Sequence, residues 1–298
     1  MLDESVIKRL AFIKCLYKVA VEQSERPEPL CSASILTFHD AIELCLQLAS
    51  EYLDVGKAQP SFMEYWDLLS QKLPGVGLTQ RESIRRLNKA RVGLKHYGIL
   101  PSKLDIEAFR ASVTNFFEEN TPTVFKIEFS DISLIDLVQC EDIKNKLKEA
   151  ENMLREGRVD DALENVAFAF AQLIDDYESR KSEQYGRSAL FSDESYIPTF
   201  LSTECDFGSD VESFADDVIS EFEDIHKDIN ILSLNLNSQK YVKFRLLTPK
   251  VRISGGDPHR YHIHKVQRRS KRVPTVEDAQ FCIDFVIESA VTLQEFDF

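Results

Sequence analysis

Residues 30–53 read LCSASILTFHDAIELCLQLASEYL, and their apolar positions decide the class of fold. These positions are Ile35, Phe38, Ile42, Cys45, Ala49 and Tyr52. Spacings of three and four residues predict an amphipathic helix, because such positions share one face. Residues 3–23 repeat the pattern, and only SERPEP (24–29) separates the two stretches. A connection this short favours antiparallel neighbours in an up-and-down helical bundle.

Further helices are expected before residue 120. A short one covers residues 62–73, another ends at the helix-stopping Gly98, and a third covers residues 105–118. Thr79 and Glu82 have the spacing of a capping box at the start of the second of these. We therefore predict a helical-bundle domain over residues 1–120.

The rest of the chain, residues 121–298, predicts an α+β domain. Phe125, Ile127 and Phe129 alternate with polar neighbours, which indicates a short extended segment or a linker. Two apolar helical patterns on either side of Gly157 predict a helical hairpin over residues 141–180. A final helix is expected over residues 275–295. Its start has a second capping-box pair, Thr275 and Asp278.

The net charge is −14, but the charge is segregated. Residues 192–228 are rich in Asp and Glu and form either a solvated loop or a cover for the basic segment that follows. Residues 240–272 are basic, and apolar and basic residues alternate there, which predicts a small antiparallel sheet with one basic face. Clustered positive charge is typical of phosphate binding. The predicted nucleic-acid-binding residues are Lys243, Arg245, Lys250, Arg252 and Arg260.

Composition excludes several classes of protein. The apolar content of 43% and the small number of Gly and Pro, 10 each, indicate a folded and mainly α-helical chain. No apolar run is long enough to cross a bilayer and the first residues lack a signal-peptide layout, so we expect a cytoplasmic protein without membrane contact. The six scattered cysteines are expected to be buried, reduced thiols.

Common catalytic motifs are also missing. The sequence has no phosphate-binding Gly-rich loop, no Gly-x-Ser-x-Gly and no His-Glu-x-x-His, which argues against ATP hydrolysis, dinucleotide redox chemistry and serine hydrolysis. His259, His262 and His264 are spaced for a shared strand face, but their basic surroundings are poor for a divalent ion. We expect no metal and no cofactor.

Residues 87–98, LNKARVGLKHYG, are the stretch best suited to chemistry. Arg91 occupies a position on the apolar stripe, so it needs a carboxylate such as Glu43, or it lies at the mouth of a pocket or at a subunit interface. His96 follows near the helix end. On one helix the two are about 140° and about 7.5 Å apart, so both reach one phosphate only if the last turn unwinds or two copies meet. Lys95 would add charge, and Tyr97 is a second supporting candidate.

These residues resemble the motif of the HEPN superfamily, all-α domains in which an Arg, four to six residues and a His form a ribonuclease site. Residues 38–44, FHDAIEL, are similar to the second helix of that family, and the resemblance covers roughly residues 1–120. The family usually has a polar residue after the Arg, whereas this chain has Val92.

The resemblance implies metal-independent cleavage of RNA by attack of the ribose 2′-OH on the adjacent phosphate. His96 would move protons and Arg91 would stabilise the phosphorane. It also implies a homodimer, a role as a defence or toxin effector, and a protein partner from the same system. The alternative is a non-catalytic helical module that docks protein or nucleic acid through its charged C-terminal segments.

Overall fold

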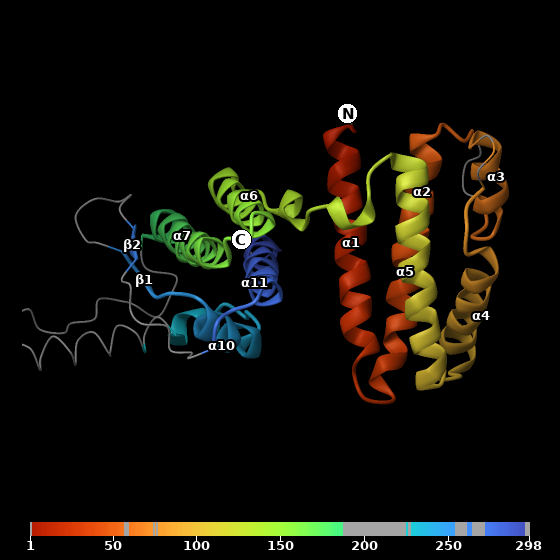
Figure 1. Ribbon diagram of the computed structural model, residues 1–298. Helices are drawn as coiled ribbons and strands as arrows, with labels where there is room; N and C mark the ends of the chain where they lie inside the picture. The colour runs from red at the N-terminus through yellow and green to blue at the C-terminus, as the bar shows by residue number, and fades with distance from the viewer. Residues whose placement is uncertain are drawn as a thin grey trace, which may run out of the picture. The chain divides into compact units, whose positions relative to one another are not determined.

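The computed structural model describes residues 2–56, 60–73, 75, 77–186, 225, 228–253, 261–263 and 272–295. These residues are predominantly α-helical, which confirms the predicted class (Figure 1). The chain divides into two compact units, Met1–Leu137 and Val138–Phe298. No helix in the described ranges is both long and apolar enough to span a membrane.

The first unit is a bundle of antiparallel helices. Its members are α1 (Glu4–Ser24), α2 (Ser34–Tyr52), α3 (Glu64–Lys72), α4 (Arg81–Tyr97) and α5 (Lys103–Phe125), with the 3₁₀ turns η1 (Leu30–Ala33), η2 (Phe129–Asp131) and η3 (Leu134–Leu137). Helices α1 and α2 pack along each other, as their short connection predicts, and α2 also contacts α4 and α5. This arrangement places α4 at one edge of the bundle, against α2 and α5.

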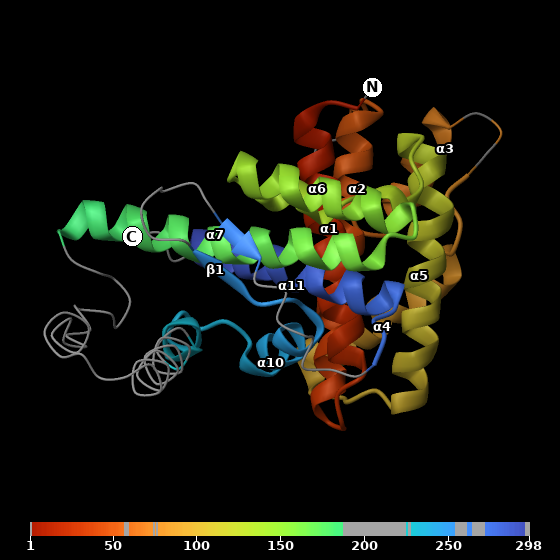
Figure 2. The same ribbon diagram turned by 60° about the vertical axis from the view of Figure 1, so that its left-hand side comes forward.

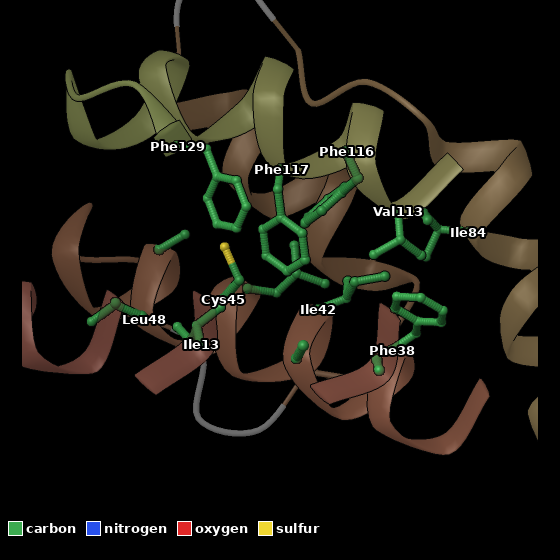
Figure 3. Packing of buried hydrophobic residues seen from close by; sticks show 14 of the residues in the cluster. Ile13, Phe38, Ile42, Cys45, Leu48, Ile84, Val113, Phe116, Phe117 and Phe129 are labelled. Atoms are coloured by element: carbon green, nitrogen blue, oxygen red, sulfur yellow. The ribbon is translucent and has the colours of Figure 1, made fainter. Parts of the chain in front are cut away.

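Aromatic rings from α2, α5 and η2 pack together in the bundle core, with aliphatic side chains such as Ile13 of α1 beside them (Figure 3). The Phe117 ring stacks on Phe129 with centroids 4.7 Å apart and meets Tyr17 edge-on at 5.4 Å. Phe125 is buried as well. The predicted extended segment over residues 125–129 is therefore wrong, because α5 continues to Phe125 and the 3₁₀ turn η2 then directs Phe129 into the same core. The first unit thus extends past residue 120.

The two ends of α4 are fixed in different ways. The predicted capping box at its start is not formed, because Gln80 rather than Thr79 precedes the helix and Asn120 engages Thr79: the Thr79 N–H donates to Asn120 Oδ1 (2.9 Å), and the Thr79 hydroxyl accepts from Asn120 Nδ2 (3.1 Å). At the other end Gly98 adopts a left-handed conformation, φ 66°, and its N–H donates to the Leu94 carbonyl. This confirms the predicted glycine stop, and the last turn stays helical.

The second unit is also helical, with α6 (Glu141–Arg155), α7 (Val159–Tyr185), α10 (Ser238–Leu247) and α11 (Val276–Glu295) (Figure 2). Helices α6 and α7 form the predicted hairpin, and Gly157 lies in the turn between them. Rings of Phe170, Phe244 and Phe285 meet with centroids 5.0–5.4 Å apart. The capping box of α11 is confirmed, since the Thr275 N–H donates to Asp278 Oδ2 at 3.0 Å.

Within the described ranges, the predicted basic sheet over residues 240–272 is not formed as predicted. Residues 240–247 belong to α10, because Tyr241, Phe244 and Leu247 are buried at the three-residue spacing of a helix, while Val242 and Leu246 are exposed. Among the residues that the structure describes after α10, the strands are β1 (Val251–Ile253) and β2 (Tyr261–Ile263), which form an antiparallel pair within the predicted sheet region. The apolar residues of the 240–247 stretch fit both the two-residue period of a strand and the spacing of a helix, and the structure has a helix there.

The described cysteines form no disulfide, and three of the five are buried as expected, whereas Cys15 and Cys140 are half-buried. Cys31, Cys45 and Cys282 are buried, and burial raises the pKa of the Cys45 and Cys282 thiols to about 12. These thiols are therefore protonated at neutral pH. Cys205 and nearly all of the acidic stretch over residues 192–228 lie outside the described residues.

Candidate functional site

Helix α4 is strongly basic in an otherwise acidic chain. It contains six Lys or Arg and a single acid, Glu82. Arg85, Arg86 and Lys89 are exposed, and helical geometry places them with His96 within a stripe about 100° wide. Arg85 is paired with Glu82 at 3.2 Å. The stripe presents positive charge along one side of α4, which sequence reasoning did not single out.

His96 lies in the last turn of α4 and is exposed. The Tyr97 ring lies edge-on to it at 6.5 Å between centroids, and Lys95 beside it is also exposed. The sequence therefore placed these three predicted residues correctly at a helix end. An exposed imidazole here can exchange protons with a bound molecule.

Arg91 is half-buried and lies on a different face of α4 from His96. In the part of the chain that the structure describes, its side chain forms no hydrogen bond and no ion pair, so the expected alternative of a closed pair with Glu43 is not formed. Its charge acts on the His39 ring of α2. A guanidinium partly withdrawn from water without a carboxylate is a favourable contact for an anionic ligand.

His39 is the functional candidate that sequence reasoning missed. It is only 3% exposed, its ring stacks on Phe62 at 4.2 Å, and its Nε2 lies 3.1 Å from Asn88 Oδ1 on α4. Burial, and to a smaller extent the charge of Arg91, lowers the pKa of His39, against the opposite effects of Glu43 and Asp40. The available signal was a histidine on the apolar side of residues 38–44 with carboxylates one and four positions later.

Two of the predicted nucleic-acid-binding residues lie on a helix. Lys243 and Arg245 lie on α10 rather than on a strand, which corrects their predicted placement. The Lys243 Nζ lies 3.9 Å from the Phe281 ring centre, and Arg245 pairs with Asp228. Both cations therefore already have partners within the second unit.

Lys250 precedes β1 and is half-buried, and Arg252 pairs with His262 across the two strands through the backbone. The side chains of Arg252 and His262, and Arg260, His259 and His264 altogether, lie outside what the structure describes. The candidate site accordingly rests on α4 and the adjoining face of α2.

No family model, no curated protein and no solved structure matches this chain.

Proposed function

We propose that the chain is a HEPN-like, metal-independent endoribonuclease that works as a homodimer. The observation that supports this most is the half-buried Arg91, which lacks a carboxylate partner among the described residues. A guanidinium that is partly withdrawn from water and has no carboxylate partner gains from contact with an anion. An RNA phosphate would supply the missing anion.

The arrangement of α4 supports a site shared by two copies. Arg91 and His96 lie on different faces, and the closed last turn, ending at Gly98, keeps them there. Next to His96 is an exposed apolar patch: Tyr97 (75% exposed), Ile99 (63%), Leu100 (57%) and Leu104 (77%). A second copy on this patch would bury it and bring His96 of one copy towards Arg91 of the other.

The proposed reaction is attack of the ribose 2′-OH on the adjacent phosphate. His96 would take the proton from the hydroxyl, and Arg91 would stabilise the negative charge of the phosphorane by paired N–H donors. Lys95 and Tyr97, at the same end of α4, would assist His96. The family also suggests a defence or toxin effector with a protein partner from the same system.

Cleavage of a mixed RNA substrate in excess chelator tests the reaction. We expect the wild-type chain to cleave in the chelator and the Arg91→Ala/His96→Ala variant to lose at least about 100-fold in rate, since acid–base catalysis alone contributes that much. Lys18→Ala on α1 serves as the control. Activity that vanishes in chelator and returns with Mg²⁺ would contradict the mechanism, and RNA binding without any cleavage would favour the non-catalytic module.

The basic stripe leads to a prediction about RNA affinity. In a His96→Ala background, which prevents cleavage, Arg86→Gln/Lys89→Gln should weaken binding to single strands of any sequence. The slope of log affinity against log salt should flatten by about 0.7 for each lost phosphate contact. Lys8→Gln/Lys18→Gln removes the same charge from α1 and should leave the slope unchanged. An equal change in both variants would mean that net charge, not α4, governs binding.

A further inference from the structure

Three side chains on α2 bring a ring nitrogen and two carboxylate oxygens close together. His39 Nδ1 lies 3.6 Å from Glu43 Oε2 and 3.8 Å from Asp40 Oδ1. All three donor atoms lie within 4.8 Å of one another. Asp40 is exposed, Glu43 is half-buried and His39 is buried, so the group lies at the rim of the α2–α4 contact.

The hydrogen-bonding state of His39 explains why this arrangement is unusual. Its Nε2–H can donate to Asn88 Oδ1, at 3.1 Å, which leaves Nδ1 with a lone pair. Nδ1 is buried and has no hydrogen-bond partner. A buried acceptor facing two carboxylates is repelled by them unless a cation lies between.

We propose that His39, Asp40 and Glu43 bind a first-row transition-metal dication, with Zn²⁺ as the representative ion. Imidazole combined with carboxylates suits Zn²⁺ and its neighbours better than Mg²⁺, which prefers oxygen ligands alone and retains its waters. The site does not depend on the proposed ribonuclease reaction, in which no metal takes part.

Distances and outer contacts fit such an ion. Ligands about 2.0–2.1 Å from a tetrahedral Zn²⁺ lie about 3.4 Å apart, so the two separations from His39 Nδ1, 3.6 and 3.8 Å, need to shrink by only a few tenths of an ångström. The two carboxylates are exposed or half-buried side chains within 4.8 Å of each other, and they can rotate to close the remaining distance. The hydrogen bond from His39 to Asn88 and the stacked Phe62 ring fix the plane and tautomer of the imidazole. Metal-binding histidines are commonly held through their other nitrogen in this way.

Arg91 opposes the ion, since its charge already acts on the His39 ring. The two carboxylates balance the dication, and Arg91 adds one positive charge nearby. Removing that charge with Arg91→Ala should therefore tighten Zn²⁺ binding. If Zn²⁺ bound elsewhere on the chain, its affinity would not change in Arg91→Ala.

Calorimetric titration of the full-length, metal-stripped chain with ZnCl₂ tests the proposal. Glu43→Gln and Asp40→Asn change carboxylates at the protein surface, so the fold should survive, whereas a substitution of buried His39 is less suitable. We expect each to weaken binding at least about tenfold, the loss usual for a disturbed metal site. Glu107→Gln, which removes one exposed carboxylate from α5, should bind as the wild type does.

Nitrogen-15 NMR of the imidazoles identifies the ligand atom. On adding Zn²⁺, the Nδ1 signal of His39 should shift while Nε2 keeps its proton, and an excess of Mg²⁺ should not reverse the shift. Two results would overturn the proposal: undiminished Zn²⁺ affinity in Glu43→Gln, or a Zn²⁺-induced shift confined to the other histidines. Protonation of Nδ1 without metal uptake would mean that a proton occupies the position instead.

Discussion

A fragment of residues 1–137 is expected to fold alone, whereas a fragment of residues 1–120 is expected to be unfolded. The longer fragment contains the entire first unit. The shorter one ends inside α5 and loses Phe125 and Phe129, which are buried in the core. Loss of one buried phenylalanine costs about 3–5 kcal/mol, and two such losses approach the roughly 5–15 kcal/mol that stabilise a whole domain.

Circular dichroism during heating distinguishes the two fragments. The 1–137 fragment should melt cooperatively, and Phe129→Ala within it should lower the melting temperature without abolishing the transition. Lys14 adds a further link, because its Nζ donates to the carbonyls of Ser130 (2.8 Å) and Ile132 (2.6 Å). If the 1–120 fragment melts as cooperatively and at the same temperature, the residues after 120 are dispensable for the bundle.

Mixing two inactive variants is expected to restore RNA cleavage. If each site takes Arg91 from one copy and His96 from the other, Arg91→Ala and His96→Ala should each lose at least about 100-fold in rate. After subunit exchange, half of the dimers are mixed and each has one intact site of two. The mixture should therefore recover about a quarter of the wild-type rate.

Controls separate a shared site from a site within one chain. Each single variant mixed with itself should stay inactive, and Leu104→Glu in both partners should prevent recovery by charging the apolar patch. A mixture with no more activity than the single variants would show that one chain supplies both residues. Sedimentation of the Leu104→Glu chain should give a monomer, and a persisting dimer would place the interface elsewhere.

Helical periodicity predicted the bundle and the hairpin because their apolar stripes are long. Residues 30–53 give α2, and both sides of Gly157 give α6 and α7. Short segments were ambiguous. Residues 240–247 fit alternation and a helix alike, and the packing of Phe244 on Phe170 and Phe285, distant in sequence, accompanies the helical form. Capping boxes differed for a similar reason: Thr275 is available to cap its helix, whereas Thr79 is bound by Asn120.

The sequence located Arg91 and His96 because their spacing is a local feature. It did not locate His39, whose significance depends on Asn88 and Phe62, contacts that only the folded bundle creates. For the basic stretch over residues 240–272, the sequence suggested binding residues that the fold uses for internal contacts. Lys243 and Arg245 look free in the sequence, but Phe281 and Asp228 engage them in the fold.

The hydrogen bond that joins Thr79 to Asn120 has a consequence for the timing of biosynthesis. Thr79 immediately precedes the helix that carries Arg91 and His96, and its partner is 41 residues further along the chain. Domains fold as units on the ribosome. The hydrogen bond that fixes the start of α4 therefore forms only after the end of α5 has left the exit tunnel. A nascent chain that has exposed only residues up to Gly98 therefore carries the Arg–His motif in an unfinished bundle, and the motif takes its position late, together with the last turns of the first unit.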